Sequence, residues 1–392
     1  MKNWVFGFLV FGFLVFFLAH LFSVSYLFHG IRSTYLRGES SAQIDDLRFF
    51  YNREVLAENP VYLPIASDFS NIFLSPEVEK VLVNSKSVAF LVIQKDSVRV
   101  EKYWNIGNES YLSNSFSVAK SIVSLLIGCA IDDGYISSVE QSIFDFLPEI
   151  SPFEGHDVKI KHLLEMSSGL DWVEHYTKPI SITAKSYYGK NLEELVLGLD
   201  FIEPPGKTYR YLSGNTQLLG LILSRAVGEN ISSYTSRALW SKVGAMKSAK
   251  WTLDKEGGVE KTFCCFNSSA RDFSKIGLLM LGRGKVFQKR VVSESYVDWL
   301  LKQPDLIDGD ISASGDKKLN YYSNGWWTAR VFENNIFYAR GFRGQYVVVV
   351  PDLDLVFVRL GMFEDDSSSL SNDYTLTDDL LFLIESVIKN FS

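Results

Sequence analysis

A serine and a lysine that lie three residues apart in this chain could form a catalytic pair. Ser117-Val118-Ala119-Lys120 places a hydroxyl and an amine on one face of a helix, because residues i and i+3 are neighbours there. A lysine held neutral by burial can take the serine proton, and a helix N-terminus offers free N–H groups to a developing oxyanion. This spacing is typical of serine acyl enzymes.

The same spacing occurs at two other places, and their context differs. Residues 314–317 lie in a polar stretch that contains glycine, and residues 386–389 end the helix predicted to close the chain. Ser117 instead opens an apolar helical run that ends at Gly134. On spacing and context alone, an ordinary helix-capping serine remains an open alternative for Ser117.

The composition excludes several classes of protein. The chain has 392 residues, with 39 basic and 46 acidic side chains and a formal charge of -7, which argues against a nucleic-acid partner. Three cysteines do not make a disulfide framework, and no Cys/His spacing indicates a metal site, so no cofactor is expected. We expect the adjacent Cys264 and Cys265 to be buried small residues, because neighbouring cysteines rarely form a disulfide.

The N-terminal segment is strongly apolar. Between Asn3 and Leu27, His20 is the only side chain that could carry a charge near neutral pH, and about 20 apolar residues suffice to span a bilayer. The length of the run favours an uncleaved anchor over residues 1–30, with a cleaved signal peptide as the alternative. The sequence thus predicts a single-pass membrane protein whose catalytic domain is extracytoplasmic, or periplasmic in a bacterium.

The remaining chain divides into a lead-in and one large domain. Residues 31–80 show little regular pattern and are predicted as a linker with an extended lead-in, followed by a domain over 81–392. Two short strands are expected at 87–104 around a Lys95-Asp96 turn.

Helical patterns and β-rich patterns then follow one another. Helices and loops dominate residues of about 135–260, and a further helix is expected at 268–283. Strands are expected between 324 and 363, and a closing helix at 373–390. Strands at both ends with helices between them predict an α/β fold, in which helices flank an antiparallel sheet and an all-helical lobe is inserted.

Four blocks of sequence carry a family resemblance. Residues 115–136, 162–172, 204–220 and 341–358 resemble, in this order, serine hydrolases related to class C β-lactamases. This group includes penicillin-binding DD-peptidases, esterases and 6-aminohexanoate-dimer hydrolases. The resemblance implies a β-lactamase-like sandwich of an antiparallel sheet flanked by helices, with an all-helical lobe.

The resemblance also implies a catalytic tyrosine as general base and acid. Tyr211 follows Ser117 by 94 residues, which matches the family's order of blocks better than the rival Tyr322. With Tyr211 in that position, Ser213 replaces the asparagine of the family's Y-x-N motif and becomes a candidate substrate contact. A Y-x-S form resembles the amide hydrolases and esterases of the group more than its β-lactamases.

The family's third block is a strand that carries K-T-G or a looser equivalent. Its best match here is Phe342-Arg343-Gly344. The resemblance implies an oxyanion hole formed by the backbone N–H groups of Ser117 and Phe342. The family's lysine is missing, so Arg343, or Arg340, is the candidate partner of a substrate carboxylate. Gly344, and Trp172 in a loop expected over the site, are further candidate substrate contacts.

The sequence therefore predicts a membrane-anchored serine hydrolase that cleaves an amide or ester of a small molecule or short peptide. Ser117 would form the acyl-enzyme, with Lys120 and Tyr211 as acid and base. The alternatives are a penicillin-binding DD-peptidase or β-lactamase acting on cell-wall peptides or β-lactams, and a non-catalytic binding protein. The sequence specifies neither the substrate nor the oligomeric state.

Overall fold

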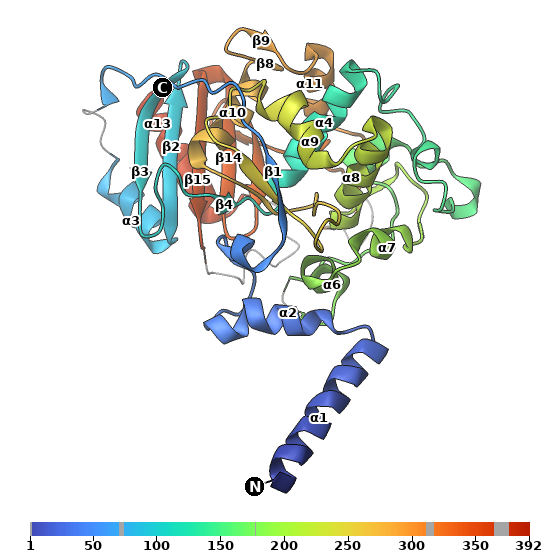
Figure 1. Cartoon of the computed structure of the whole chain (residues 1–392). Coiled ribbons are helices and arrows are strands. Elements are labelled where there is room, and N and C mark those ends of the chain that lie inside the picture. Colours follow the sequence, from blue (N-terminus) through green and yellow to red (C-terminus); the bar gives the residue numbers. More distant parts are fainter. Residues whose placement is uncertain (1, 70–73, 177, 311–316, 364–375) are drawn as a thin grey trace.

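The structure is a computed structural model that describes residues 2–69, 74–176, 178–310, 317–363 and 376–392, with part of the side chains in the first helix. A seven-stranded sheet forms one half of the body, and a mainly helical lobe forms the other (Figure 1). Every pair of neighbouring strands in this sheet is antiparallel. The strands, in spatial order, are β11 (Tyr322–Ser323), β12 (Trp326–Val331), β13 (Asn334–Gly341), β14 (Gln345–Val350), β15 (Leu355–Gly361), β2 (Ser87–Gln94) and β3 (Ser97–Tyr103).

Helices cover both faces of this sheet, which explains why its central strands are apolar throughout. In β14, Val347 packs into one hydrophobic core and the next residue, Val348, packs into the other, because successive side chains of a strand point to opposite faces. The first core includes α4 (Val118–Asp132) and α10 (Ala270–Leu281), and the second includes α3 (Pro76–Asn84) and α13 (Asp378–Phe391).

Several sequence predictions are confirmed in this half. The two strands predicted at 87–104 are β2 and β3, and the Lys95-Asp96 turn joins them with both residues at positive φ (50° and 59°). The helix predicted from Ser117 to Gly134 is α4, and Gly134 (φ 79°) follows its end. The helices predicted near 268–283 and at the C-terminus are α10 and α13.

The helical lobe packs against α4 through α8 (Ser213–Val227), which is buried along most of its length. The predicted lobe at about 135–260 is helical but also supplies two strands. Its helices are α5 (Ile160–Leu164), α6 (Ile182–Tyr188), α7 (Leu192–Leu197) and α9 (Ile231–Thr235), and its strands are β5 (Thr208–Tyr209) and β6 (Ala249–Thr252). Beyond the lobe, β7 (Phe266–Ser268), β8 (Lys285–Val286), β9 (Lys289–Arg290), α11 (Glu294–Leu301) and β10 (Ile307–Asp308) lead back to the large sheet.

The segment predicted as a linker differs from that expectation. Residues 31–80 contain β1 (Asn52–Val55), which pairs with β6 in a second sheet of order β1-β6-β7-β4, where β4 is Ser113–Asn114. They also contain the start of α3 and two 3₁₀ turns. This segment is therefore part of the folded body, because its backbone hydrogen bonds are made with distant parts of the chain.

The N-terminal apolar run is not one helix. The first helix, α1 (Lys2–Leu21), ends before Ser23, which has a positive φ of 54°, and a second helix, α2 (Tyr26–Ser33), follows. Helix α2 is attached to the body: the Tyr26 hydroxyl donates to the Pro179 carbonyl (3.1 Å), and His29 hydrogen-bonds the carbonyls of Tyr188 and Phe49. These contacts account for the break after α1.

Among the residues that the structure describes, no helix is both long enough and apolar enough to cross a membrane. The membrane anchor predicted for residues 1–30 is therefore not supported by the structure.

Candidate active site

Ser117 lies at the start of α4, directly after a residue with a strained backbone. It is the residue before the first helical turn, yet its side chain makes no capping hydrogen bond. The preceding residue, Phe116, has a φ of 45°, in the left-handed region that bulky L-residues rarely adopt. The structure thus does not use Ser117 as an ordinary helix cap, and its hydroxyl lines a cleft instead.

Lys120 lies one helical turn further on and contacts this hydroxyl. Its Nζ donates to Ser117 Oγ (3.0 Å) and to the Phe263 carbonyl (2.8 Å). Burial lowers the pKa of Lys120 to about 8, and the Glu174 carboxylate acts in the opposite direction. A substantial fraction of Lys120 is therefore neutral in mildly alkaline solution and able to accept a proton.

Tyr211 lies at the same hydroxyl. Its side chain hydrogen-bonds Ser117, and its ring centroid is 5.1 Å from the Lys120 Nζ. Burial raises the pKa of Tyr211 above its usual range, although the bond to Ser117 lowers it in part. The rival Tyr322 lies on β11, with its ring against that of Tyr211 (6.0 Å between centroids), and it does not line the cleft. The structure thus brings Tyr211, rather than Tyr322, to Ser117.

The C-terminal end of strand β13 forms another wall of the cleft. Strand β13 ends at Gly341, where a side chain would lie 2.1 Å from the Ser115 carbonyl oxygen, so only glycine allows this approach. The next residue, Phe342, lines the cleft with Ser117. Within the described part of the chain, the backbone N–H groups of Ser117 and Phe342 have no hydrogen-bond acceptor.

The predicted third motif lies beside the strand rather than on it. Residues 342–344 form the turn after β13, with positive φ at Arg343 (59°) and Gly344 (75°). The Arg343 side chain is buried and donates to the Ala42 carbonyl and to Ser41 Oγ, both at 2.7 Å. Arg343 thus holds the N-terminal segment against the cleft wall. Arg340, which is on β13, is the arginine that the strand itself contributes to the cleft.

Two of the predicted substrate contacts do not line the cleft. Trp172 is 4 % exposed and packs against the backbone of Gly214, so it belongs to the core. Ser213 is buried at the start of α8, where its N–H donates to Glu174 Oε1 (2.6 Å). Gly344 does line the cleft.

The two rival serine–lysine pairs are not comparable sites. Ser314 lies outside the described residues, and Lys389 on α13 is exposed and pairs with Glu385 (3.7 Å).

Sequence reasoning missed much of the cleft wall. Trp327 on β12 lines it whereas Trp326 is buried in the core, as expected of neighbours on a strand. Tyr176 stacks on Phe342 (5.7 Å between centroids), and Tyr346 completes an aromatic wall beside Arg340. Only the alternation of the two tryptophans was visible in the sequence, because the other contacts join distant segments.

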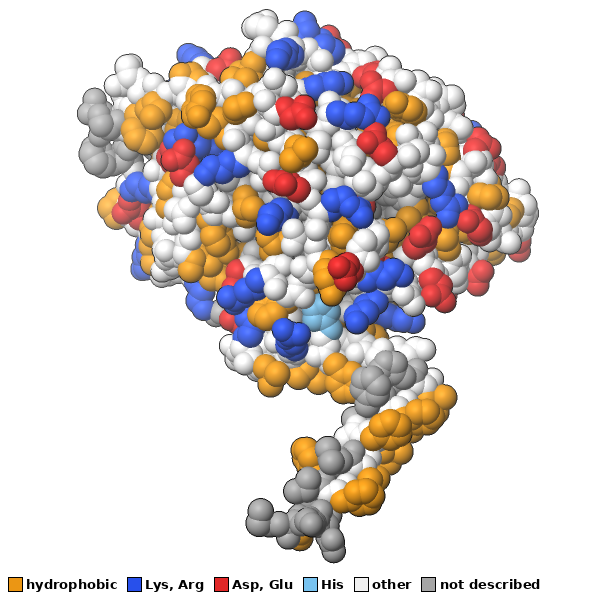
Figure 2. Space-filling view, viewed as in Figure 1, with side chains coloured by type: hydrophobic (Ala, Val, Ile, Leu, Met, Phe, Trp, Pro, Cys, Tyr) orange, Lys and Arg blue, Asp and Glu red, His pale blue; other side chains and the backbone are white. Residues whose placement is uncertain are grey.

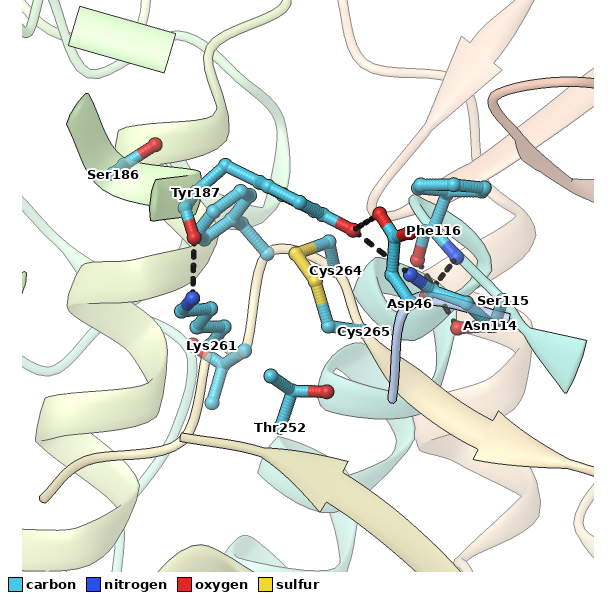
Figure 3. The surroundings of a disulfide bond; sticks show 12 residues. Asp46, Asn114, Ser115, Phe116, Ser186, Tyr187, Thr252, Lys261, Cys264 and Cys265 are labelled. Atoms are coloured by element: carbon cyan, nitrogen blue, oxygen red, sulfur yellow. Dashed lines mark hydrogen bonds between the residues drawn. A yellow bond between two sulfur atoms is a disulfide. The ribbon is translucent and has the colours of Figure 1, made fainter. Parts of the chain in front are cut away.

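The loop that holds Lys120 contains an unexpected disulfide. Cys264 and Cys265 are bonded to each other (Figure 3), contrary to the expectation of two free buried thiols. The preceding residue, Phe263, supplies the carbonyl that accepts from Lys120. Trp251 Nε1 donates to the carbonyls of Lys261 and Cys264 (3.0 and 3.1 Å), so the loop is held on both sides of Phe263.

The described residues contain no group of three histidine, cysteine or acidic side chains placed to hold a metal ion.

Comparisons with known proteins identify the family of the chain. The sequence profile of the family described as Beta-lactamase matches residues 78–374. The 6-aminohexanoate-dimer hydrolase of Paenarthrobacter ureafaciens is 26% identical over 313 residues, which cover 74% of this chain and 76% of that protein.

Solved structures show the same fold. A Bacillus anthracis protein assigned as a 6-aminohexanoate-dimer hydrolase superposes with a TM-score of 0.71 at 21% identity, covering 91% of this chain and 92% of that one. A penicillin-binding protein of Bacillus halodurans gives a TM-score of 0.61 at 15% identity, covering 79% and 99%.

Proposed function

The chain belongs to the beta-lactamase family of serine hydrolases, and from this premise we propose that it cleaves a linear amide or ester through an acyl-enzyme on Ser117. The observation that carries the proposal is the contact of Lys120 Nζ with Ser117 Oγ (3.0 Å), at a hydroxyl that Tyr211 also hydrogen-bonds. These contacts support the proposal that a base and an acid act on one nucleophile that lines a cleft.

The pKa directions assign the two proton-transfer roles. Burial lowers the pKa of Lys120 to about 8 and raises that of Tyr211, so the lysine is the group that loses its proton first. Neutral Lys120 therefore accepts the Ser117 proton as Oγ attacks the substrate carbonyl carbon. Tyr211, which stays protonated, donates its proton to the departing nitrogen or oxygen and regains one from Lys120.

The oxyanion of each tetrahedral intermediate is assigned to the N–H groups of Ser117 and Phe342. Both have no acceptor in the described residues, and backbone donors of this kind are preorganised for developing charge. In the second half-reaction, water loses a proton to Lys120 and attacks the acyl carbon. Ser117 leaves with a proton, which restores the free enzyme.

The cleft wall favours a small substrate with an extended apolar part and an anionic end. Tyr176, Trp327 and Tyr346 offer flat apolar surfaces, and Arg340 offers a cation beside them, which can pair with a carboxylate. A linear amide of an amino acid fits this description and matches the substrate named for the relative from Paenarthrobacter ureafaciens. The second candidate, a DD-peptidase or β-lactamase, would bind its substrate carboxylate at the same arginine.

A substrate panel tests the proposal. Wild type and Ser117→Ala are assayed on p-nitrophenyl esters, the linear 6-aminohexanoate dimer, nitrocefin and a D-Ala-D-Ala peptide. We expect turnover of the esters and the linear amide that depends on Ser117. Faster turnover of nitrocefin or the D-Ala-D-Ala peptide favours the second candidate. Hydrolysis that is equal in both proteins overturns the assignment of Ser117.

The location of the catalytic domain outside the cytoplasm remains a prediction from the apolar N-terminus. Protease accessibility of the domain in intact cells or spheroplasts, followed by fractionation, tests it. Protection of the domain until the cytoplasmic membrane is broken would contradict it.

A further inference from the structure

A second cavity, separate from the Ser117 cleft, lies between α2 and the helices α6 and α7. Its lining includes four basic side chains, Arg32, Arg48, Lys185 and Lys190, and a single acidic one, Glu194. The cations come from three separate segments of the chain, so the fold gathers positive charge at this place.

Most of this charge is not neutralised by the protein. Arg48 pairs with Asp45 (2.8 Å). None of the carboxylates that the structure describes lies within ion-pair distance of Arg32, Lys185 or Lys190. His29, which also lines the cavity, has a pKa lowered by burial and by the nearby Lys261 and Lys190. The cavity is therefore suited to an anion.

The outer face of α2 is apolar directly beside this cavity. Phe28, Ile31, Tyr35 and Leu36 are exposed, Leu36 by 76 %, whereas Tyr26 on the inner face is buried. Phe28 and Ile31 are three residues apart and share one side of α2, and the exposed Tyr35 and Leu36 follow in the 3₁₀ turn after α2. Figure 2 shows an apolar strip along this edge of the molecule, with basic side chains just above it.

We propose that the α2 face lies in the headgroup region of an anionic phospholipid bilayer, and that the basic cavity receives a lipid phosphate. An exposed apolar strip with cations next to it is the pattern of a helix that lies in a membrane interface. The apolar side chains enter the acyl boundary while Arg32, Lys185 and Lys190 meet the negative charge. Helix α1, with exposed apolar side chains such as Trp4, Phe6 and Phe8, continues from the same edge.

This surface is connected to the catalytic cleft. The chain that follows α2 reaches Ser41 and Ala42, which accept hydrogen bonds from Arg343 at the cleft wall. A bilayer against the α2 face would therefore lie on the same side of the molecule as the segment that Arg343 of the cleft wall contacts. The proposal does not depend on the hydrolase mechanism.

Vesicle partitioning of the full chain tests the electrostatic part. Co-sedimentation is measured on phosphatidylcholine vesicles with and without phosphatidylglycerol, at low and high salt. The double variant Lys185→Glu/Lys190→Glu should lose its preference for the anionic vesicles, by about fivefold or more for each cation removed. Its binding to the neutral vesicles should not change. The matched control is Lys285→Glu/Lys289→Glu, because these exposed lysines lie on β8 and β9 at the far end of the body.

Spin labels test the apolar part independently of α1. A nitroxide at Ile31→Cys or Leu36→Cys should become more accessible to oxygen than to an aqueous relaxant when vesicles are added. A label at Val83→Cys, which is exposed on α3, should stay aqueous. Hydrolysis of soluble esters by all of these variants should equal that of the wild type, so a failure of membrane binding is distinguishable from a failure of catalysis.

Three results would overturn the proposal. Equal partitioning of wild type and Lys185→Glu/Lys190→Glu on anionic vesicles, or labels at Ile31 and Leu36 that remain aqueous, would exclude the bilayer as partner. Binding of inorganic phosphate by calorimetry, without any preference for anionic vesicles, would assign the cavity to a soluble anion instead.

Discussion

Two lysines of this protein are buried to a similar degree, but their amines contact different groups. Lys120 and Lys261 are both enclosed, and each donates to a backbone carbonyl, of Phe263 and Tyr187 respectively. Burial lowers the pKa of Lys120 to about 8 and that of Lys261 to about 7. Judged by burial and pKa alone, Lys261 is the more perturbed of the two.

The difference lies in what each amine can reach. Lys120 Nζ is 3.0 Å from a hydroxyl that opens into a cleft. Lys261 Nζ lies 4.0 Å from the centroid of the Phe50 ring and 5.4 Å from that of Tyr187. Figure 3 shows Lys261 to one side of the disulfide, with its amine bonded to Tyr187. A lowered lysine pKa therefore identifies a catalytic group only where a nucleophile and an open path adjoin it.

Removal of the nucleophile has the largest expected effect. Ser117→Ala should lower kcat/KM for an activated ester by on the order of 10⁴-fold or more, because no acyl-enzyme forms. Ser124→Ala, on the same helix with its hydroxyl bonded to the Ser121 carbonyl (2.8 Å), is the control and should stay near wild type. Steady-state kinetics on p-nitrophenyl esters measure both variants. Comparable losses of kcat/KM in Ser117→Ala and Ser124→Ala would show that the hydroxyl beside Lys120 is not the nucleophile, and Lys120 would then not differ from Lys261.

Substitution of the two lysines tests the comparison directly. Lys120→Met should lose about 10³-fold in kcat because the general base is gone. Lys261→Met should keep most of its activity, since no reacting group lies at that amine. Both variants should melt at or above the wild-type temperature, because an apolar side chain replaces a buried cation of similar length. A loss in Lys261→Met as large as that in Lys120→Met contradicts the comparison.

Tyr211 and Tyr322 can be compared in the same way, with a smaller expected loss of kcat. Tyr211→Phe should lower kcat by about 10²-fold through the loss of the general acid, and the loss should be greatest for substrates with poor leaving groups. Tyr322→Phe, beside it in the core, should be near wild type. Amides and activated esters are compared in both variants, and a leaving-group dependence in Tyr322→Phe instead would reverse the assignment.

The pH profile should follow Lys120. Its base form is populated only as the pH rises through about 8, so kcat/KM should rise over that range and then level off. The Glu174 carboxylate raises the pKa of Lys120. Glu174→Gln should therefore move the rising limb of the kcat/KM profile to lower pH. Glu193→Gln, on the exposed start of α7, is the control. A limb that is unchanged in Glu174→Gln, or that moves to higher pH, counts against Lys120 as the titrating base.

The disulfide should have the smallest effect. Cys264→Ala/Cys265→Ala should lower kcat severalfold, because the loop that presents the Phe263 carbonyl to Lys120 loses a constraint. Treatment with a dithiol should lower the wild-type rate and leave the double variant unchanged. Equal sensitivity of both proteins to the dithiol would indicate that the loop does not need the bond.

The features predicted best from the sequence are those that depend on local pattern or on the order of segments along the chain. The strands around Lys95-Asp96, the helix that begins after Ser117 and the choice of Tyr211 over Tyr322 all depended on residues close in sequence or on the order of blocks. The period of a strand allows at most one of the neighbours Trp326 and Trp327 to face the cleft, but it does not say which.

What the sequence did not predict depends on contacts between distant segments. Arg343 is expected to bind a substrate carboxylate, and it does line the cleft, but its guanidinium donates to Ser41 and Ala42, some 300 positions earlier in the chain. Residues 31–80 looked irregular because β1 finds its partner only in β6. General geometry argues against the bond between Cys264 and Cys265, and the loop that allows it is not visible in the local sequence pattern.

The most direct test of the central claim is covalent labelling of the full chain with a fluorophosphonate probe, followed by peptide mapping. We predict a single adduct on the peptide that contains Ser117, absent in Ser117→Ala, strongly reduced in Lys120→Met and retained in Lys261→Met. No adduct on the wild type, or an adduct on any other serine, would contradict the account.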